Sequence, residues 1–282
     1  MKIKLHVVVF VLCSHFVKAQ NFHGKAVYKT SRKSSFKISF EKETGIDNKM
    51  QEELQKRFQK MNQKTFVLEF SKYTSTYKQN AVLDVPNSQV GKNKAMVFSF
   101  DGAGSNDIYY KNIQENRFAN QTGIQGKRFL VKDKLEDFKW ELSSETKNIG
   151  IYTCYKATFS KKVEDSSVTI KKGSSVEDKK KEIISTTVWY TTQIPVRNGP
   201  KNYQGLPGLI LEVNDGRNRI ACIEIILNPM DIVSIQEPEK GKVVSKKKYV
   251  KIQEQKAQEI MDHMKGRNGL DMGNDLNVKF GG

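Results

Sequence analysis

The stretch from Gly205 to Val213 limits the possible folds of this chain more than any other. Gly205-Leu206-Pro207-Gly208 holds two glycines and a proline, which do not fit inside a helix. The apolar run Leu209–Val213 follows at once and is typical of a strand. We therefore expect a sharp backbone corner here that leads directly into a core strand.

An Asp-Gly pair, Asp215-Gly216, separates this run from a second apolar run at 219–227. Because glycine accepts the positive φ of a tight turn, the pair predicts a two-residue hairpin loop. Such a loop would place Val213 opposite Asn218, Leu211 opposite Ile220 and Leu209 opposite Cys222. The alternation predicts that one face, toward the core, holds Leu209, Leu211, Ile220 and Cys222.

Short strand-like runs with turn residues between them recur through the rest of the chain. They lie at 24–30, 36–40, 65–71, 73–77, 96–100, 108–111, 127–131, 140–142, 151–159 and 186–192. Helical spacing of apolar residues appears near 49–63 and, more loosely, near 246–262. The sequence therefore predicts a mainly β (α+β) fold: a strongly curved antiparallel sheet or half-barrel with one or two helices.

The first 19 residues resemble a secretory signal, with a basic start, an apolar stretch at 5–17 and Val17-Lys18-Ala19 before the expected cut. An uncleaved anchor is the alternative. We expect export to the periplasm, the outer-membrane region or the outside of the cell. Residues 20–264 are then one β-rich domain with a long mobile loop at 161–184, and residues 265–282 a flexible tail. No later segment is long and apolar enough to be expected to span a membrane.

The chain carries a formal net charge of +17. Its lysines are scattered and mixed with acidic residues, so a solvated basic surface is favoured and no nucleic-acid partner is expected. Anionic envelope lipid or polysaccharide is the alternative partner for this charge.

Two cysteines, Cys154 and Cys222, remain outside the signal. An even pair in an oxidising compartment allows one disulfide. Two buried thiols are the alternative.

Residue types for catalysis are scarce in the mature chain. Its only histidines are His23 and His263, one near each end, so no Ser-His-Asp, Cys-His or multi-histidine metal site is predicted. Asp133, Glu136 and Asp137 form an acidic stretch that is typical of surface charge. We predict no catalytic, cofactor or metal residues and a non-enzymatic protein; a hydrolase that uses carboxylates alone is the less favoured alternative.

Several ordered blocks resemble the GLPGLI family of exported proteins from Bacteroidetes-type bacteria. The resemblance rests on Trp140, Glu145-Thr146-Lys147, Tyr152–Ala157 with Cys154, Trp189, Tyr190, Pro195, Gly199, Pro200, Tyr203, Gly205, Leu206, Pro207, Gly208, Leu209 and Ile210. It implies export, an envelope setting and a β-rich domain, but no reaction. The long segment 161–184 and Cys222 depart from the family pattern.

The strand pattern and the family setting predict a binding or carrier protein that holds an apolar ligand, lipid-like or peptide, on a concave sheet. The alternative is an envelope assembly or interaction protein that binds a protein partner through its basic surface and the 161–184 loop. The motif residues themselves are expected to be structural, because glycine and proline more often encode backbone geometry than chemistry.

Overall fold

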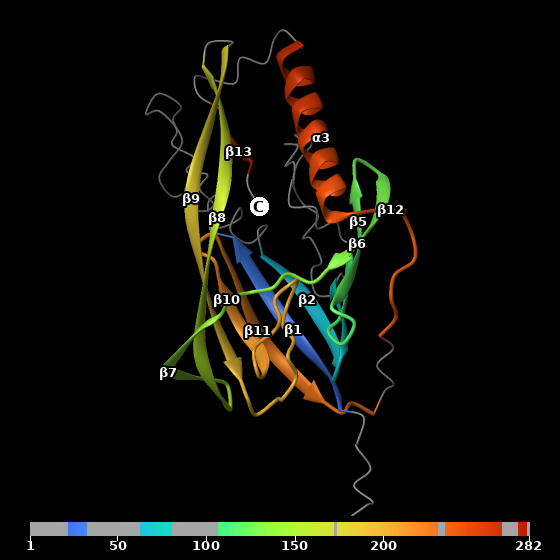
Figure 1. The fold of residues 1–282 in the computed structure, drawn as a ribbon, viewed down its shortest axis with the longest axis vertical. Coiled ribbons are helices and arrows are strands. Elements are labelled where there is room, and N and C mark those ends of the chain that lie inside the picture. Colours follow the sequence, from blue (N-terminus) through green and yellow to red (C-terminus); the bar gives the residue numbers. More distant parts are fainter. Residues whose placement is uncertain are drawn as a thin grey trace, which may run out of the picture.

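The computed structural model describes residues 22–32, 63–80, 107–171, 174–230, 235–266 and 276–280. These residues form one sheet and one helix, α3 (Lys246–Gly266) (Figure 1). The strands are β1 (His23–Arg32), β2 (Gln63–Ser71), β3 (Thr74–Gln79), β4 (Ile108–Asn112), β5 (Arg117–Ile124), β6 (Lys127–Lys134), β7 (Glu141–Ile149), β8 (Tyr152–Lys171), β9 (Ser174–Thr191), β10 (Leu209–Asn214), β11 (Asn218–Leu227), β12 (Lys242–Val244) and β13 (Leu276–Phe280).

The sheet is open and almost entirely antiparallel. Its order is β12-β6-β5-β4-β3-β2-β1-β11-β10-β9-β8, with β7 and β13 on the free side of β8. Only β12 pairs in parallel, with β6. The mainly β, antiparallel prediction is confirmed: the sheet curves strongly but its two edges do not meet (Figure 1).

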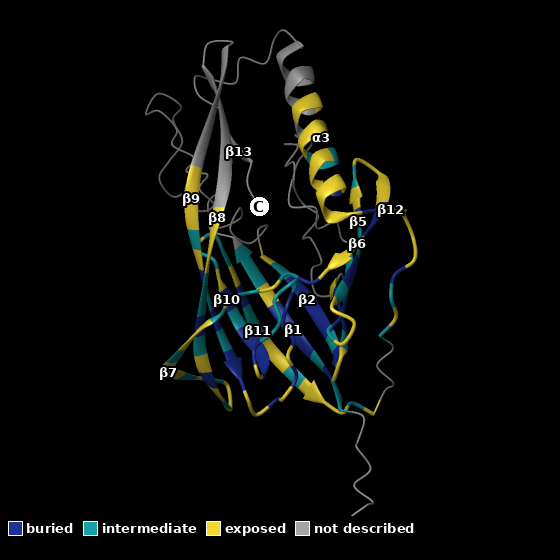
Figure 2. Cartoon of the chain, in the orientation of Figure 1, coloured by how far each residue is buried: buried dark blue, intermediate teal, exposed yellow. Residues whose placement is uncertain are grey.

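The main core lies on the concave face of the central strands. Tyr28, Leu68 and Phe70 are fully buried there, and Val188 joins them from β9. Each such side chain contributes about 1.5–3 kcal/mol by leaving water. Figure 2 shows these buried strands gathered at the base of the molecule.

A second, smaller core joins α3 to one side of the sheet. Tyr249 packs edge-on against Phe129, with ring centroids 5.7 Å apart, and Phe118, Val131, Leu135 and Val244 complete the cluster. The helix predicted near 246–262 is therefore present and extends to Gly266. The helix expected at 49–63 falls outside the described residues, except that Gln63 begins β2. The strands expected at 36–40 and 96–100 and the signal at 1–19 also fall outside them.

Residues 161–184 differ from the expected loop. The structure continues β8 and β9 as paired strands up to Lys171 and Ser174. The register puts Glu164 opposite Lys181 and Asp165 opposite Lys180, and oppositely charged cross-strand residues are compatible with pairing. The many charged residues at 161–184 therefore did not indicate a loop.

Two further expectations need correction. The tail expected at 265–282 contains β13, which pairs with β8 from Leu276 to Phe280. The β10–β11 loop is also longer than two residues, because Val213 lies opposite Ile220 and not Asn218. Within the part of the chain that the structure describes, no helix is long and apolar enough to cross a membrane.

Candidate functional site

The family-like residues from Pro195 to Gly208 lie in the segment between β9 and β10, residues 192–208, here called the motif segment. It packs onto the concave face of the sheet, where Ile194, Val196 and Leu206 are almost completely buried. Its backbone is tied to the start of β10: the Leu209 N–H donates to the Ile194 carbonyl at 3.0 Å, and the Ile210 N–H donates to the Asn198 carbonyl at 3.0 Å. The motif segment is thus part of the core and fills the base of the curved sheet.

Close backbone approach explains the motif glycines. A Cβ built on Gly208 would lie 2.0 Å from the Thr191 carbonyl oxygen, and one on Gly199 would lie 2.8 Å from the Ile210 Cβ. Gly205 has φ +99, a conformation that other residues rarely adopt. Of the motif prolines, Pro200 is buried, whereas Pro195 and Pro207 are exposed.

A buried lysine holds the turn at 199–203 in place. Lys111 reaches from β4, is 0% exposed, and its Nζ donates to the Gly199 carbonyl at 2.6 Å and to the Tyr203 carbonyl at 3.0 Å. Burial holds the pKa of Lys111 well below its ordinary value. The buried amine thus has two carbonyl acceptors for its N–H groups. The sequence assigned Lys111 to a strand but missed this role.

Two neighbouring polar side chains fix the same segment. Ser75 Oγ donates to Asn198 Oδ1 at 3.2 Å, and Tyr28 donates its hydroxyl proton to the Ile210 carbonyl at 2.7 Å. Because all of these groups are buried, each hydrogen bond satisfies a polar atom that water does not reach.

The connection between β6 and β7, residues 135–140, crosses the concave side of the sheet above the motif segment (Figure 1). Glu136 lies in it and accepts hydrogen bonds from Lys161 of β8 at 3.0 Å, from Lys246 of α3 at 3.3 Å and from Asn202 at 3.3 Å. Its carbonyl accepts one from Gln204 Nε2 at 2.8 Å. Burial alone would raise the pKa of Glu136, but the two lysines outweigh it and hold the pKa below its ordinary value.

A cluster of aromatic side chains packs between this connection and the motif segment. Phe138 stacks on Trp140 and Tyr203, with ring centroids 5.1 and 5.6 Å apart, and packs edge-on against Phe159 at 5.2 Å. Trp140 Nε1 donates to the Gln204 carbonyl at 3.0 Å. Burial raises the pKa of Tyr203 to about 12, so its phenol is neutral at pH 7.

The two aromatic residues at the end of β9 have different surroundings. Tyr190 is buried in the core, whereas Trp189 is half-buried with the Lys147 Nζ 4.3 Å from its ring centroid. Lys147 also pairs with Glu212 at 2.7 Å, and Glu212 pairs with Arg219 at 3.1 Å. The family-like Lys147 of β7 thus contacts the family-like Trp189 of β9 and pairs with Glu212 of β10.

The two cysteines are free thiols in this structure, which corrects the possible disulfide. Cys154 lies in β8 and Cys222 in β11, with β9 and β10 between them. Burial raises the pKa of Cys154 to about 11 and that of Cys222 to about 12.

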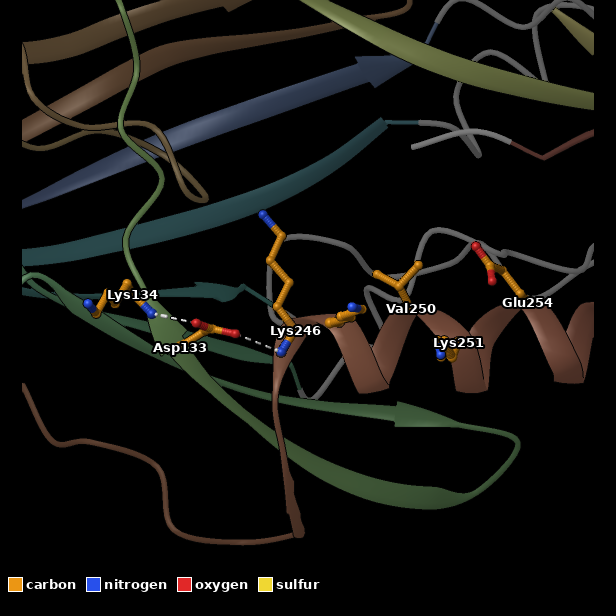
Figure 3. Close-up of a pocket in the computed structure, with 7 residues that line it drawn as sticks. Asp133, Lys134, Lys246, Val250, Lys251 and Glu254 are labelled. Atoms are coloured by element: carbon orange, nitrogen blue, oxygen red, sulfur yellow. Dashed lines mark hydrogen bonds between the residues drawn. The ribbon is translucent and has the colours of Figure 1, made fainter.

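A shallow groove opens where α3 begins, with a volume of about 550 Å³. It is lined by Asp133, Lys134, Lys246, Lys247, Val250, Lys251 and Glu254 (Figure 3). Asp133 accepts the Lys134 N–H at 2.9 Å and the Lys246 N–H at 3.0 Å. Asp133 therefore acts as an acceptor for the first turn of a helix that begins with three lysines.

Comparison with known protein families finds a match in the part of the chain that contains the motif segment. A family model described as "Protein of unknown function (Porph_ging)" matches residues 140–212, from β7 through the motif segment into β10. No curated protein sequence matches the chain.

Two solved structures resemble the chain at 13% sequence identity: "Structure of PNGF-II in C2 space group", with a TM-score of 0.46, and "Structure of PNGF-II in P21 space group", with a TM-score of 0.47. Each alignment covers 83% of this chain, but only 33% and 34% of the solved chains. The chain thus spans about a third of the length of these two structures.

Proposed function

We propose that this is an exported cell-envelope protein of the GLPGLI type that works by binding a protein partner, without catalysis. Its binding surface is formed by the outer parts of the β8–β9 hairpin and of α3, here called the two arms. The resemblance of its motif blocks to that family supports the envelope setting. The match at residues 140–212 to a family of unknown function covers some of the same blocks.

One observation carries the proposal. The motif segment and the β6–β7 connection fill the base of the concave face, whereas the two arms extend beyond this base (Figure 1). Lys161 and Lys246, at the roots of the arms, are both anchored to Glu136. Two long elements thus extend from the base, which suits a protein that presents a surface to a partner.

Occupation of the base also favours a partner over an apolar ligand. A lipid-like ligand on the concave face would need the space that Ile194, Val196 and Leu206 occupy. Those side chains complete the core, so the chain itself supplies the apolar filling.

Three carboxylates among the described residues have shifted pKa values. Glu136, Glu212 and Glu237 all have pKa values below the ordinary one, because pairing with basic residues outweighs their burial. A carboxylate that acts as a general acid needs the opposite shift. Among the described residues, these carboxylates therefore stabilise the fold in their charged form.

The test shortens one arm without touching the base. Val163 and Glu182 are directly opposite in the hairpin, so replacing residues 164–181 by Asn-Gly closes it with a two-residue turn. The matched control puts Asn-Gly in place of Gln125-Gly126, in the turn between β5 and β6. Complexes are cross-linked in the native envelope, purified and identified by mass spectrometry.

We expect the wild type and the control to retain one common partner and the shortened variant to lose it at an unchanged melting temperature. Retention of the partner by the shortened variant would contradict the proposal, as would the absence of a protein partner from all three.

A further inference from the structure

The surface where α3 meets β6 and β12 concentrates positive charge that the fold does not neutralise. Lys134, Lys242, Lys247, Lys248 and Lys251 are all exposed, and none forms an ion pair with another described residue. By contrast, Lys132 and Lys246 nearby are paired with Glu237 and Glu136. The surface therefore keeps a local excess of unpaired cations.

One of the two acidic residues that line the groove, Asp133, is already engaged. Both oxygens of Asp133 accept backbone N–H groups, so its charge serves the start of α3. Glu254 lies at the far end of the groove, three residues beyond Lys251 (Figure 3). Among the lining residues for which the structure shows no ion pair, Lys134, Lys247 and Lys251 outnumber Glu254.

An aliphatic side chain lies among these lysines. Val250 is 41% exposed and lines the groove between Lys247 and Lys251. A soluble polyanion gains nothing from an exposed valine. A membrane surface does, because apolar side chains enter the boundary between headgroups and acyl chains while lysines attract anionic headgroups.

We propose that this surface docks on an anionic lipid bilayer, with a headgroup phosphate received by the groove at the start of α3. The inference goes beyond the proposed function, since it needs neither the β8–β9 hairpin nor a protein partner. It gives the molecule an orientation, with α3 and the β12 edge of the sheet toward the membrane.

The test measures binding of the purified chain to vesicles of phosphatidylglycerol and phosphatidylcholine in equal parts, and to vesicles of phosphatidylcholine alone, at low salt. The test variant is K247Q/K251Q; glutamine preserves helix propensity. The matched control, K29Q/K162Q, removes the same charge at exposed positions on β1 and β8. Val250→Ser probes the apolar contribution, with dextran sulfate as the soluble polyanion for comparison.

We expect the wild type to bind the anionic vesicles only. K247Q/K251Q should lose roughly 30-fold in affinity for them, since each lysine at an anionic surface contributes roughly fivefold. The control should lose less than twofold. Val250→Ser should weaken vesicle binding and leave dextran sulfate binding unchanged. Equal losses in the two double variants, no binding to anionic vesicles, or losses confined to dextran sulfate would each overturn the proposal.

Discussion

At the residue scale, Gly208 shows most clearly why the motif has its composition. Any Cβ at this position would overlap the Thr191 carbonyl oxygen at 2.0 Å. We predict that Gly208→Val lowers the free energy of unfolding by about 3 kcal/mol, since the backbone of a packed core must shift. Gly123→Ala is the control, because its Cβ would lie 3.5 Å from the nearest atom. Urea denaturation checks both; an equal change in the two variants would refute the close-approach explanation.

The burial of Lys111 leads to a prediction about how the stability of the fold depends on pH. Its folded pKa lies well below its ordinary value of 10.5, so its stabilising contribution is present above 10.5 and is lost as pH falls through the folded pKa. Lys111→Met leaves the Gly199 and Tyr203 carbonyls without their donor. We expect the variant to be about 2 kcal/mol less stable than the wild type at pH 9.

The deficit of Lys111→Met should shrink as pH falls, because the wild type then loses the contribution of its amine and the variant has none to lose. Denaturation at several pH values between 6 and 9.5 gives the difference between the two proteins. A deficit that does not change with pH would mean that Lys111 is charged in the folded state.

Sequence reasoning reached the backbone role of Gly208 but not Lys111. Glycine and proline constrain φ locally, so their role is visible without any tertiary contact. A lysine on a strand carries no local mark of burial, and its two acceptors come from residues 88 and 92 positions away in the chain. Only the folded sheet brings them together.

At the element scale, the start of α3 depends on another strand. The helix begins with Lys246-Lys247-Lys248 and has no acidic residue in its first turn, which is unfavourable at the positive end of the helix dipole. Asp133 compensates from the end of β6, and Ser245 Oγ accepts the Lys248 N–H at 3.3 Å. We predict that Asp133→Ala costs about 1 kcal/mol of stability.

Asp133→Asn separates the two contributions of this side chain, since it keeps an oxygen acceptor and removes the charge. It should cost about half as much as Asp133→Ala, and salt should reduce that cost because screening weakens the charge–dipole term. Chemical denaturation at low and high salt measures this. No loss in Asp133→Ala would show that Ser245 alone caps the helix.

The β10–β11 hairpin has a different register from the one that its turn residues predict. Asp215-Gly216 did mark a turn between two strands, as predicted. The Asp215 side chain, however, accepts the N–H groups of both Arg217 and Asn218, which draws two more residues into the loop. Side-chain bonds of this kind compete with the shorter turn, and they shift the register by two residues without changing which face is buried.

At the scale of the whole molecule, Glu136 ties the two arms to the base. Its pKa is depressed, so its stabilising contribution is present above the ordinary pKa of 4.5 and is lost as pH falls through the folded pKa. We predict that Glu136→Gln costs about 1 kcal/mol at pH 7, because its lysine partners are half-exposed and screened by solvent.

The difference between Glu136→Gln and the wild type should shrink as pH falls below 4.5 through the folded pKa, because the wild-type carboxyl then takes up a proton. Thermal unfolding at pH 7 and pH 3 measures it, with Glu115→Gln, an exposed surface carboxylate, as control. A difference that is undiminished at pH 3 would assign the effect to packing and not to charge.

The sequence predicted the mainly β class, the open curved sheet and the C-terminal helix from local periodicity. It did not predict that the β6–β7 connection crosses the concave face or that the motif segment fills the base. Both features depend on contacts between residues far apart in sequence, such as Glu136 with Lys246, and no local pattern encodes them.

The central claim is that the motif segment belongs to the core of the fold and is not an exposed binding loop. Amide hydrogen exchange of the intact chain tests this most directly. Peptides that cover residues 194–210 should exchange as slowly as those of β1 and β2, because the N–H groups of Val196, Asn198, Leu209 and Ile210 are all bonded to carbonyls of the motif segment. Exchange of these peptides within seconds, while β1 and β2 remain protected, would contradict the account.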